Sequence, residues 1–264
     1  MEGPNVLLPG MKEVNLSEED EGGLDLLAVN GEGGEAESGF NWRLCLIGRF
    51  IQSGSLDFLS MQQTLASTWK PGKGVFIKEL DNNRFLFQFY HELDIKRVVE
   101  GSPWYFNRKA LIISRMTQEG NPRCIALDTL DLWIQVHDLP IGFMTTTVLK
   151  AIGNYIGVFV DACPKNFMGI WRDYMRIRVR LELTKPLKRK MRIRQSATEW
   201  VWVNFKYENI PTFCFVCGLL GHSERFCPRR FDTPEEEIVQ PYGDWMRTPL
   251  RRPTKLIGAQ WLRT

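Results

Sequence analysis

The chain has 264 residues, of which 44% are hydrophobic and 25% charged, and this composition excludes a wholly disordered or fibrous protein. Its formal net charge of +3 hides an asymmetry, because ten of the 31 acidic residues but only Lys12 of the 34 basic ones fall in residues 1–40. Residues 41–264 therefore carry 33 basic and 21 acidic groups, a net charge of +12 that attracts polyanions.

The N-terminal residues and the cysteines indicate the compartment. No basic start followed by an apolar stretch opens the sequence, and no apolar run reaches the roughly 18–20 residues that would span a bilayer. We therefore expect an intracellular protein of the nucleus or the cytoplasm, with no membrane partner. Cys45, Cys124 and Cys163 lie in or beside apolar segments and are expected to be buried, whereas the other three cysteines cluster with a histidine as metal ligands do.

Residues 1–39 are rich in Glu, Asp, Gly and Ser and lack aromatic residues, which predicts a disordered acidic leader. Residues 40–118 then follow the order β-α-β-β-α-β, with Ser55 as the expected N-cap of the first helix. The elements are expected at 44–51, 55–68, 75–80, 84–90, 92–100 and 110–116. This order predicts an α+β domain with the ferredoxin-like arrangement, which is also the topology of RNA-recognition motifs.

Residues 128–207 predict a second α+β region that is strongly basic. Its elements are expected at 132–137, 146–156, 158–162, 174–183, 190–195 and 199–207. Residues 174–183 alternate strictly between apolar and charged side chains, as in a strand with one buried face. Residues 231–264 are rich in Pro, Arg and Trp without sustained periodicity, which predicts a flexible basic tail.

Four metal-ligand residues lie between these regions, within residues 211–230. Cys214, Cys217, His222 and Cys227 have the spacing C-x2-C-x4-H-x4-C, which offers a complete tetrahedral shell to one structural zinc ion. Such a closed shell leaves no coordination position for hydrolytic chemistry. Gly218 and Gly221 fall where a loop this short must wrap closely around the metal. The pattern predicts a CCHC zinc knuckle, a module that binds single-stranded RNA.

These residues, together with several short stretches, resemble a known family. The stretches are Leu65-Ala66-Ser67-Thr68-Trp69-Lys70-Pro71-Gly72, Asn83-Arg84-Phe85-Leu86-Phe87-Gln88-Phe89, Glu100-Gly101-Ser102-Pro103-Trp104, Trp133-Ile134-Gln135-Val136-His137-Asp138-Leu139-Pro140 and Tyr242-Gly243-Asp244-Trp245-Met246-Arg247. Over residues 40–250 the chain is similar to a plant domain of unknown function, number 4283, joined to a CCHC knuckle in Gag-like or ORF1-type proteins of LINE retrotransposons. The resemblance implies RNA binding for a retroelement or for a host gene derived from one.

The first domain differs from an RNA-recognition motif at the positions that stack on bases. Aligning Phe89 and Ile95 with the core of that motif turns Phe85 and Phe87 inward and leaves Arg84 and Leu86 at the stacking positions. This domain is therefore expected to keep the topology without the usual RNA platform, and to be available for protein contacts instead.

The second region and the knuckle supply basic and aromatic side chains. Residues 165–194 contain eleven Lys or Arg, and strand parity places three of the arginines about 6.6–6.8 Å apart on one sheet face. Basic groups beside flat rings suit sequence-tolerant binding of single strands. We predict nucleic-acid contacts at Arg176, Arg178, Arg180, Lys188, Arg189, Lys190, Arg192, Arg194, Trp200, Trp202, Lys206, Phe215 and Phe226. The alternative is a solvated sheet face with two half-buried tryptophans, and packing against the metal loop for the two phenylalanines.

Two other classes of function compete with this interpretation. The sequence has no P-loop, nucleophile elbow or acidic metal cluster, and His91 and His137 are lone histidines in apolar surroundings, so we do not expect an enzyme. The expected partners are single-stranded RNA or DNA, together with further copies of the chain in self-association. The alternative is a protein-interaction or host RNA-processing adaptor whose knuckle binds a partner polypeptide.

Overall fold

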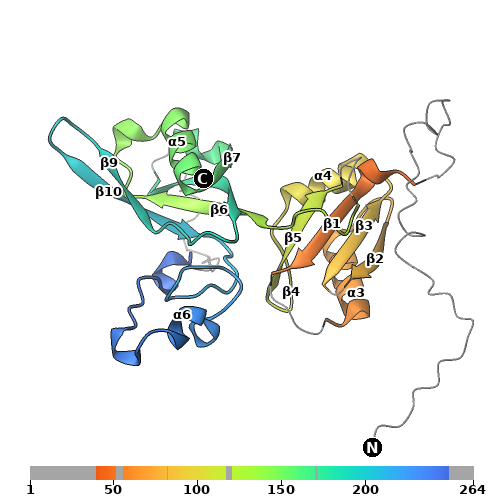
Figure 1. Ribbon diagram of the computed structural model, residues 1–264. Helices are drawn as coiled ribbons and strands as arrows, with labels where there is room; N and C mark the ends of the chain where they lie inside the picture. The colour runs from red at the N-terminus through yellow and green to blue at the C-terminus, as the bar shows by residue number, and fades with distance from the viewer. Residues whose placement is uncertain (1–39, 52–55, 82, 117–120, 170–171, 250–264) are drawn as a thin grey trace, which may run out of the picture. The chain divides into compact units, whose positions relative to one another are not determined.

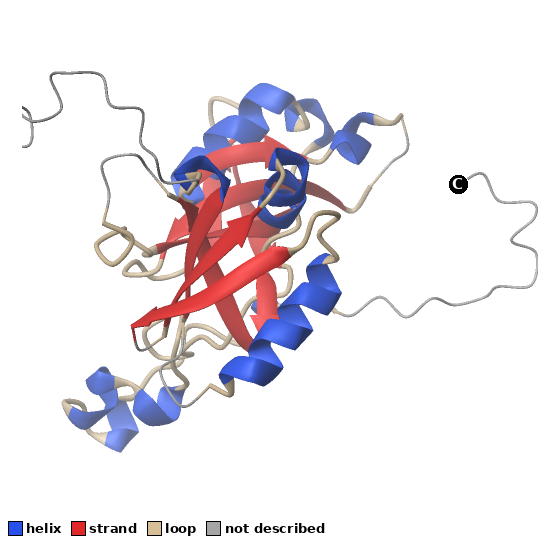
Figure 2. Cartoon of the chain, turned by 90° about the vertical axis from the view of Figure 1, so that its right-hand side faces the viewer, coloured by secondary structure: helices blue, strands red, loops and turns tan. Residues whose placement is uncertain are grey.

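The computed structural model describes residues 40–51, 56–81, 83–116, 121–169 and 172–249. Except for Phe40, these residues belong to one compact unit, Asn41–Thr264, which contains two five-stranded antiparallel sheets (Figure 1). In Figure 2 the helices lie outside the strands. The expected acidic leader, residues 1–39, lies outside the described residues.

The first sheet has the expected ferredoxin-like order with one added strand. Its elements are β1 (Cys45–Phe50), α3 (Phe58–Trp69), β2 (Val75–Asp81), β3 (Arg84–Phe89), α4 (Glu92–Glu100), β4 (Trp104–Phe106) and β5 (Lys109–Arg115), preceded by a 3-10 turn at Trp42–Leu44. The strand order is β2-β3-β1-β5-β4. Sequence patterning missed β4, which is only three residues long and pairs with β5 as a hairpin at the sheet edge. The expected N-cap Ser55 lies outside the described residues, and the side chain of Asp57 caps α3 instead.

Both long helices pack on one face of this sheet. Helix α3 buries Met61, Leu65 and Trp69 against a cluster that includes Phe85 and Phe87. The inward orientation predicted for these two phenylalanines is confirmed, because neither is more than 1% exposed. Their burial beneath the helices removes them from any surface that could stack on a base.

Helix α4 also fixes the turn that follows α3. The carboxylate of Asp94 is buried and accepts hydrogen bonds from the backbone N–H groups of Gly72 and Lys73, at 3.0 and 3.1 Å. These bonds lower the pKa of Asp94, and they outweigh the effect of burial, which alone would raise it. The ionised side chain thus ties α4 to the Pro71–Gly74 turn.

The opposite face of the first sheet is also covered. Ile47, Leu86 and Ile112 are buried in a cluster that continues through Leu130 and Leu132 of the following strand, β6 (Thr129–His137). The position that an RNA-recognition motif would use for stacking therefore holds a buried leucine, as expected. The first domain keeps the topology of that motif, and its two stacking positions, Arg84 and Leu86, carry no aromatic ring.

The second sheet has the strand order β7-β8-β6-β10-β9. Its elements after β6 are 3-10 turns at Ile141–Phe143 and Pro164–Phe167, α5 (Thr146–Ile156), β7 (Val158–Ala162), β8 (Tyr174–Glu182), β9 (Lys190–Arg194) and β10 (Trp200–Tyr207). The expected helix and strands are thus all present, and α5 and β7 have the predicted bounds. Thr145 caps α5, whose Leu149, Ile152 and Ile156 lie in the core.

Strands β9 and β10 extend beyond the rest of this sheet. Asn204–Tyr207 of β10 pairs with β6, whereas residues 200–203 pair with β9 alone, and Asn204 pairs with both strands. The outer part of the two strands is therefore a two-stranded hairpin, and no other strand of the described residues lies beside it, as Figure 1 shows. The face of this hairpin that carries Trp200 and Trp202 is exposed to solvent.

The expected flexible tail, residues 231–264, is ordered for much of its length. After the short helix α6 (Pro228–Phe231) come 3-10 turns at Glu235–Glu237 and Asp244–Met246, and Met246 is fully buried in the core. Arg247 forms a parallel bridge with Tyr207 at the end of β10. The segment lacks periodicity because single side chains anchor it, rather than one continuous apolar face. Of residues 231–264, those at 250–264 lie outside the described residues.

Two further expectations can be compared with the structure. Cys45 is buried and Cys163 half-buried as expected, but Cys124 is exposed because it lies in a turn and not in an element. Among the described residues, no helix is both long and apolar enough to cross a membrane.

Candidate metal centre and nucleic-acid interface

The knuckle begins as a miniature hairpin after β10. The backbone N–H of Cys214 donates to Leu219 O and that of Gly218 donates to Cys214 O, both at 2.9 Å, and Phe213 forms a bridge with Leu220. Gly218 and Gly221 have φ angles of +75° and +100°, which explains why glycine is needed where the loop reverses.

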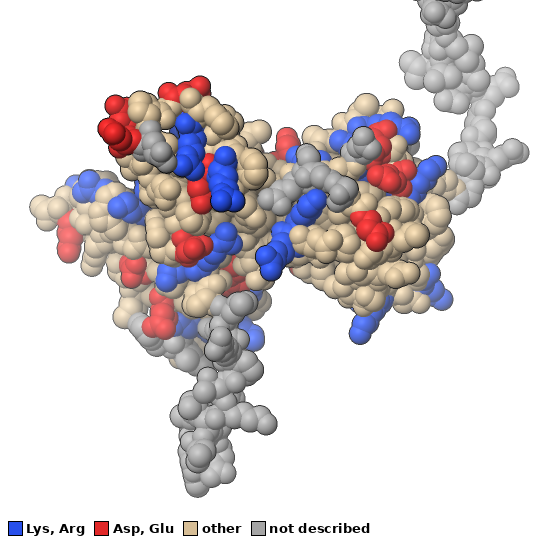
Figure 3. All heavy atoms as spheres, turned by 90° about the horizontal axis from the view of Figure 1, so that it is seen from below, with Lys and Arg blue, Asp and Glu red and all other residues tan. Residues whose placement is uncertain are grey.

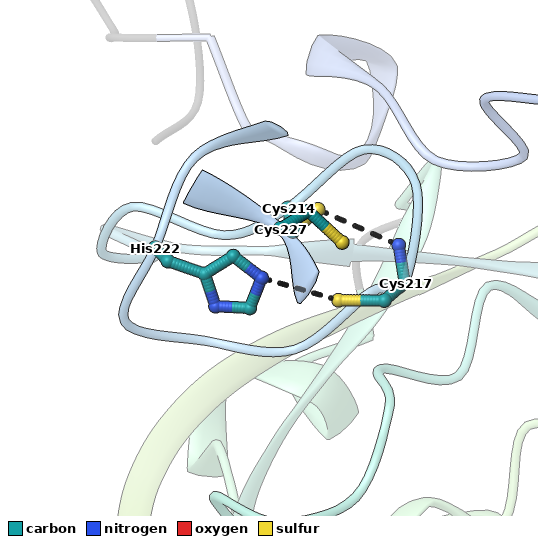
Figure 4. A group of neighbouring side chains, drawn as sticks. All are labelled: Cys214, Cys217, His222 and Cys227. Atoms are coloured by element: carbon teal, nitrogen blue, oxygen red, sulfur yellow. Dashed lines mark hydrogen bonds between the residues drawn. The ribbon is translucent and has the colours of Figure 1, made fainter. Parts of the chain in front are cut away.

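The hairpin brings the four predicted ligands together, as Figure 4 shows. The ligand atoms of Cys214, Cys217, His222 and Cys227 all lie within 4.8 Å of one another. Sγ of Cys217 is 3.4 Å from Nε2 of His222, which is close to the separation of about 3.5–3.8 Å between ligand atoms of a tetrahedral zinc site.

The chemistry of these donors fits zinc. Three sulfurs and one imidazole nitrogen make the donor set of a structural site, and all three cysteines are buried. The backbone N–H groups of Val216 and Cys217 point at Sγ of Cys214, at 3.4 and 3.5 Å, an arrangement that favours a thiolate there. A bound zinc ion would cross-link the two halves of the loop and leave no coordination position open.

Burial and hydrogen bonding act in opposite directions on the thiols. Burial raises the pKa of Cys214 to about 11. Burial acts the same way on Cys227, but hydrogen bonds from Cys214 and from backbone N–H groups of α6 outweigh it and lower the pKa of Cys227. Because a metal binds the thiolate, metal binding at Cys214 must displace a proton.

The two aromatic residues of the knuckle differ in their surroundings. Phe215 is partly buried, with its ring centroid 5.2 Å from that of Phe213, so it packs against the loop. Phe226 is 74% exposed. Of the two, Phe226 is the ring that is open to an unpaired base.

The three arginines of β8 have partners within the chain. Arg176 forms a bidentate pair with Glu208, at 2.8–3.0 Å, and stacks 3.9 Å above the Trp133 ring. Arg180 pairs with Asp131 at 2.8 Å. These contacts pair the two guanidinium groups with carboxylates of the chain and offset their charge.

Arg178 lies deeper than its neighbours and is only 7% exposed. Its guanidinium donates to the carbonyl oxygens of Glu100 and Val99, at 2.7 and 2.9 Å, and to Oγ of Ser102 at 2.9 Å. It thereby caps the C-terminus of α4, where a cation is favoured by the helix dipole. This arginine joins the second sheet to the first domain, and its donors are not available to a ligand.

The cations and rings of the β9–β10 hairpin are exposed. Trp200 and Trp202 are 50% and 49% exposed and share one face with Lys190, Arg192 and Arg194. The Lys190 nitrogen is 4.3 Å from the centroid of the Trp202 ring, and the Arg192 guanidinium lies 5.3 and 5.7 Å from the centroids of Trp200 and Trp202. This face offers rings for bases beside cations for phosphates.

The remaining predicted residues lie at two places near the hairpin. Lys188 and Arg189 precede β9, above the rings of Tyr155 and Tyr242. Lys206 is half-buried and lines a polar cleft of about 490 Å³ with His137 and Arg176. Burial, followed by the charge of Lys206, lowers the pKa of His137. Elsewhere, Figure 3 shows Lys and Arg interspersed with Asp and Glu on the face that it presents.

Sequence reasoning missed Tyr155 and Tyr242 as neighbours of these cations. Tyr155 lies on the exposed side of α5, and Tyr242 lies in the segment that was expected to be flexible. Neither residue belongs to a spacing pattern that would connect it with residues 188–190. Only the fold brings them together.

This combination of a two-sheet body with a closed CCHC cluster defines a protein with a structural metal knuckle. Comparison with known families agrees: residues 40–123 match the family described as "Domain of unknown function (DUF4283)" and residues 181–229 match "Zinc knuckle". The chain therefore belongs to the proteins in which a DUF4283 domain is followed by a CCHC-type knuckle. The knuckle match begins at residue 181 and so includes β9 and β10.

A relative is found in Arabidopsis thaliana. It is "Uncharacterized protein At4g02000", which is 24% identical to this chain over 147 residues, or 56% of the chain. The aligned part spans 46% of that protein, so the chain covers less than half of its length.

Proposed function

We propose that this protein binds single-stranded nucleic acid, RNA in the first instance, through a zinc-loaded knuckle and the face of the β9–β10 hairpin that carries Trp200 and Trp202. The observation that carries the proposal is this face, where two half-exposed indoles lie among Lys190, Arg192 and Arg194 directly before the knuckle in the chain. Zinc knuckles are single-strand RNA-binding modules. The protein acts by binding and not by catalysis.

The binding should be tolerant of sequence. Rings stack on any base, and cations contact phosphates without distinguishing the bases attached to them. The β8 arginines contribute indirectly, because Arg176, Arg178 and Arg180 hold the sheet together through Glu208, the end of α4 and Asp131. Specificity therefore rests on the single-stranded state rather than on base edges.

The cellular role is a finer part of the proposal. The order of a DUF4283 domain and a knuckle supports a Gag-like role in packaging retroelement RNA, in the nucleus or cytoplasm, by the element itself or by a domesticated derivative. A protein-binding adaptor is the alternative, and exposed apolar side chains in the knuckle and the segment after it favour it, namely Phe226, Phe231 and Val239.

The test is the affinity of the zinc-loaded chain for a fluorescent single-stranded RNA over a range of salt concentrations. Trp202→Ala should weaken binding about 5- to 150-fold, because stacking on one base is lost. Phe76→Ala, which removes a similarly exposed ring from β2, is the matched control and should leave the affinity unchanged. Zinc chelation should weaken binding, and affinity should fall steeply with salt.

Two outcomes would contradict the proposal. An absence of binding at low salt would exclude a nucleic-acid ligand. An RNA affinity that changes with neither salt concentration nor Trp202→Ala would exclude the hairpin face as the binding surface. A salt-insensitive apolar contact with another protein would support the adaptor instead.

A further inference from the structure

A cleft of about 820 Å³ lies beside the hairpin, and Lys190 of β9 and Trp202 of β10 are among the residues that line it. The end of α5, the start of β7 and the connection between β8 and β9 form its walls, together with Trp202 and Tyr242. Its volume falls within the range of about 300–1,000 Å³ that is usual for small-ligand sites.

Three consecutive cations line this cleft, and each lies over a different aromatic ring. The Lys188 nitrogen is 5.3 Å from the centroid of Tyr155, the Arg189 guanidinium is 5.2 Å from that of Tyr242, and the Lys190 nitrogen is 4.3 Å from that of Trp202. Cation–π attraction holds the charges against the rings, so both kinds of group are presented to the same space.

The charge of the cleft is positive. Lys185 is paired with Glu182 at 2.8 Å, and that glutamate is the acidic residue among those that line the cleft. Arg189 is anchored by a 2.8 Å hydrogen bond to the carbonyl oxygen of Pro241. Within the described part of the chain, Lys188 and Lys190 form no ion pair, so their ammonium groups are available to an anion.

The knuckle positions two walls of the cleft. The backbone N–H of Leu187 donates to Gly218 O at 3.0 Å, and that of Tyr242 donates to Phe215 O at 3.2 Å. The Tyr242 ring lies so close to Gly218 that a Cβ added there would be 2.3 Å from a ring atom. A folded knuckle is therefore a condition for the shape of the cleft.

We propose that this cleft holds one nucleotide of a single-stranded nucleic acid, with the base against the Tyr155 and Tyr242 rings and the phosphate at Lys188 and Lys190. The inference rests on the proposed function and deepens it. The strand would pass from Trp202 on the hairpin, through the cleft, to the knuckle. Rings and cations that line one cleft suit a nucleotide better than an acidic peptide, which would use the cations alone.

The experiment measures the binding of a fluorescein-labelled 12-residue oligouridylate to the full, zinc-loaded chain by anisotropy. Tyr155→Leu keeps an apolar side chain but removes the flat ring, and it should weaken binding about 5- to 150-fold, whereas Tyr155→Phe should bind as the wild type does. Lys188→Gln should lower the slope of log affinity against log salt by about 0.7. Tyr90→Leu and Lys96→Gln, at exposed positions of the first domain, are the controls and should change neither quantity.

A second readout locates the nucleotide directly. Photocrosslinking of an oligonucleotide that contains 4-thiouridine, followed by mass spectrometry, should find adducts at Tyr155, Trp202 or Tyr242. If the wild type binds and Trp202→Ala weakens it, but Tyr155→Leu and Lys188→Gln change nothing, the cleft proposal is overturned while the proposed function stands. If the wild type does not bind at low salt, both fail. Displacement of the oligonucleotide by an oligoglutamate of equal charge at the same concentration would overturn the nucleotide assignment.

Discussion

Replacing Arg178 with alanine should destabilise the protein far more than replacing Arg180, although the two lie two residues apart on the same face of β8. Arg178 is buried and donates three hydrogen bonds to the end of α4 and to Ser102, whereas Arg180 is exposed and pairs with Asp131. The comparison separates a buried structural arginine from an exposed one on the same face of the same strand.

The size of the effect follows from what is left unpaired. Without Arg178, the carbonyl oxygen of Val99 keeps a hydrogen bond from Ser102, but that of Glu100 loses the partner at 2.7 Å. Lost charge-assisted bonds, one orphaned acceptor and the lost interaction with the helix dipole together cost about 2–4 kcal/mol. The buried Nε of Arg178 has no hydrogen-bond partner among the described residues. Arg178→Ala should therefore cost less stability than the loss of an arginine whose donors are all hydrogen-bonded. Arg180→Ala should cost about 1 kcal/mol or less.

The assay is unfolding in urea at fixed zinc concentration, with a thermal scan alongside. For a chain of this size, Arg178→Ala should lower Tm by about 4–16 °C. Arg178→Lys should fall in between, because it keeps the charge but not the planar fork. Equal losses of stability in Arg178→Ala and Arg180→Ala would refute the reasoning that the hydrogen bonds of Arg178 to the end of α4 stabilise the fold.

Three further predictions concern other parts of the chain. Asp94→Asn should cost about 1.5–3 kcal/mol at pH 7. Because the folded pKa of Asp94 lies below its unfolded value of about 3.9, the stabilisation is present above that pH and is lost as pH falls through the folded pKa. Urea titrations from pH 5 downward should therefore show a shallower loss of stability in the variant, and identical slopes would count against the prediction. Gly218→Ala should destabilise the chain much more than Gly74→Ala, because both have positive φ but only the first Cβ would strike a ring, and melting curves giving equal losses would contradict this. Iodoacetamide should modify the exposed Cys124 in the folded chain and spare Cys45, because burial raises the pKa of Cys45 to about 11. Mass spectrometry of the digest measures the modification, and faster labelling of Cys45 than of Cys124 would contradict the prediction.

Local patterns predicted the elements well where one face of an element is continuously apolar. Helix α5 and strand β7 have the predicted bounds because the helix has an apolar stripe, and the Gly157 that follows it marks the boundary between the two. The four metal ligands were predictable for a similar reason, since all of them lie within one short loop.

Elements and contacts that depend on single distant side chains were not predictable. Strand β4 has only three residues, and its pairing with β5 follows from a tight turn at Asn107 and Arg108 rather than from an apolar pattern. The segment after residue 231 is held by Met246 and by Arg247, whose guanidinium donates to Ile210 O at 3.0 Å. Such anchors give no periodic signal.

The β8 arginines show that the sequence can predict on which face of a strand a side chain lies, but not which partners the side chain has in the fold. Strand parity places Arg176, Arg178 and Arg180 on one face, but their partners come from residues 32 to 79 positions away in the chain. A count of charges therefore overstates the surface that can attract a polyanion. Between residues 165 and 194, setting aside the ion-paired cations leaves those of the β9–β10 hairpin and the adjoining cleft, together with Lys165 and Arg172, which line the separate cleft beside His137. Each of the remaining cations of the hairpin and the adjoining cleft lies over an aromatic ring and forms no ion pair with a carboxylate among the described residues, so a phosphate can still compete for its charge. The interface that remains is smaller than the basic region of the sequence, and it lies immediately before the knuckle with which it is proposed to act.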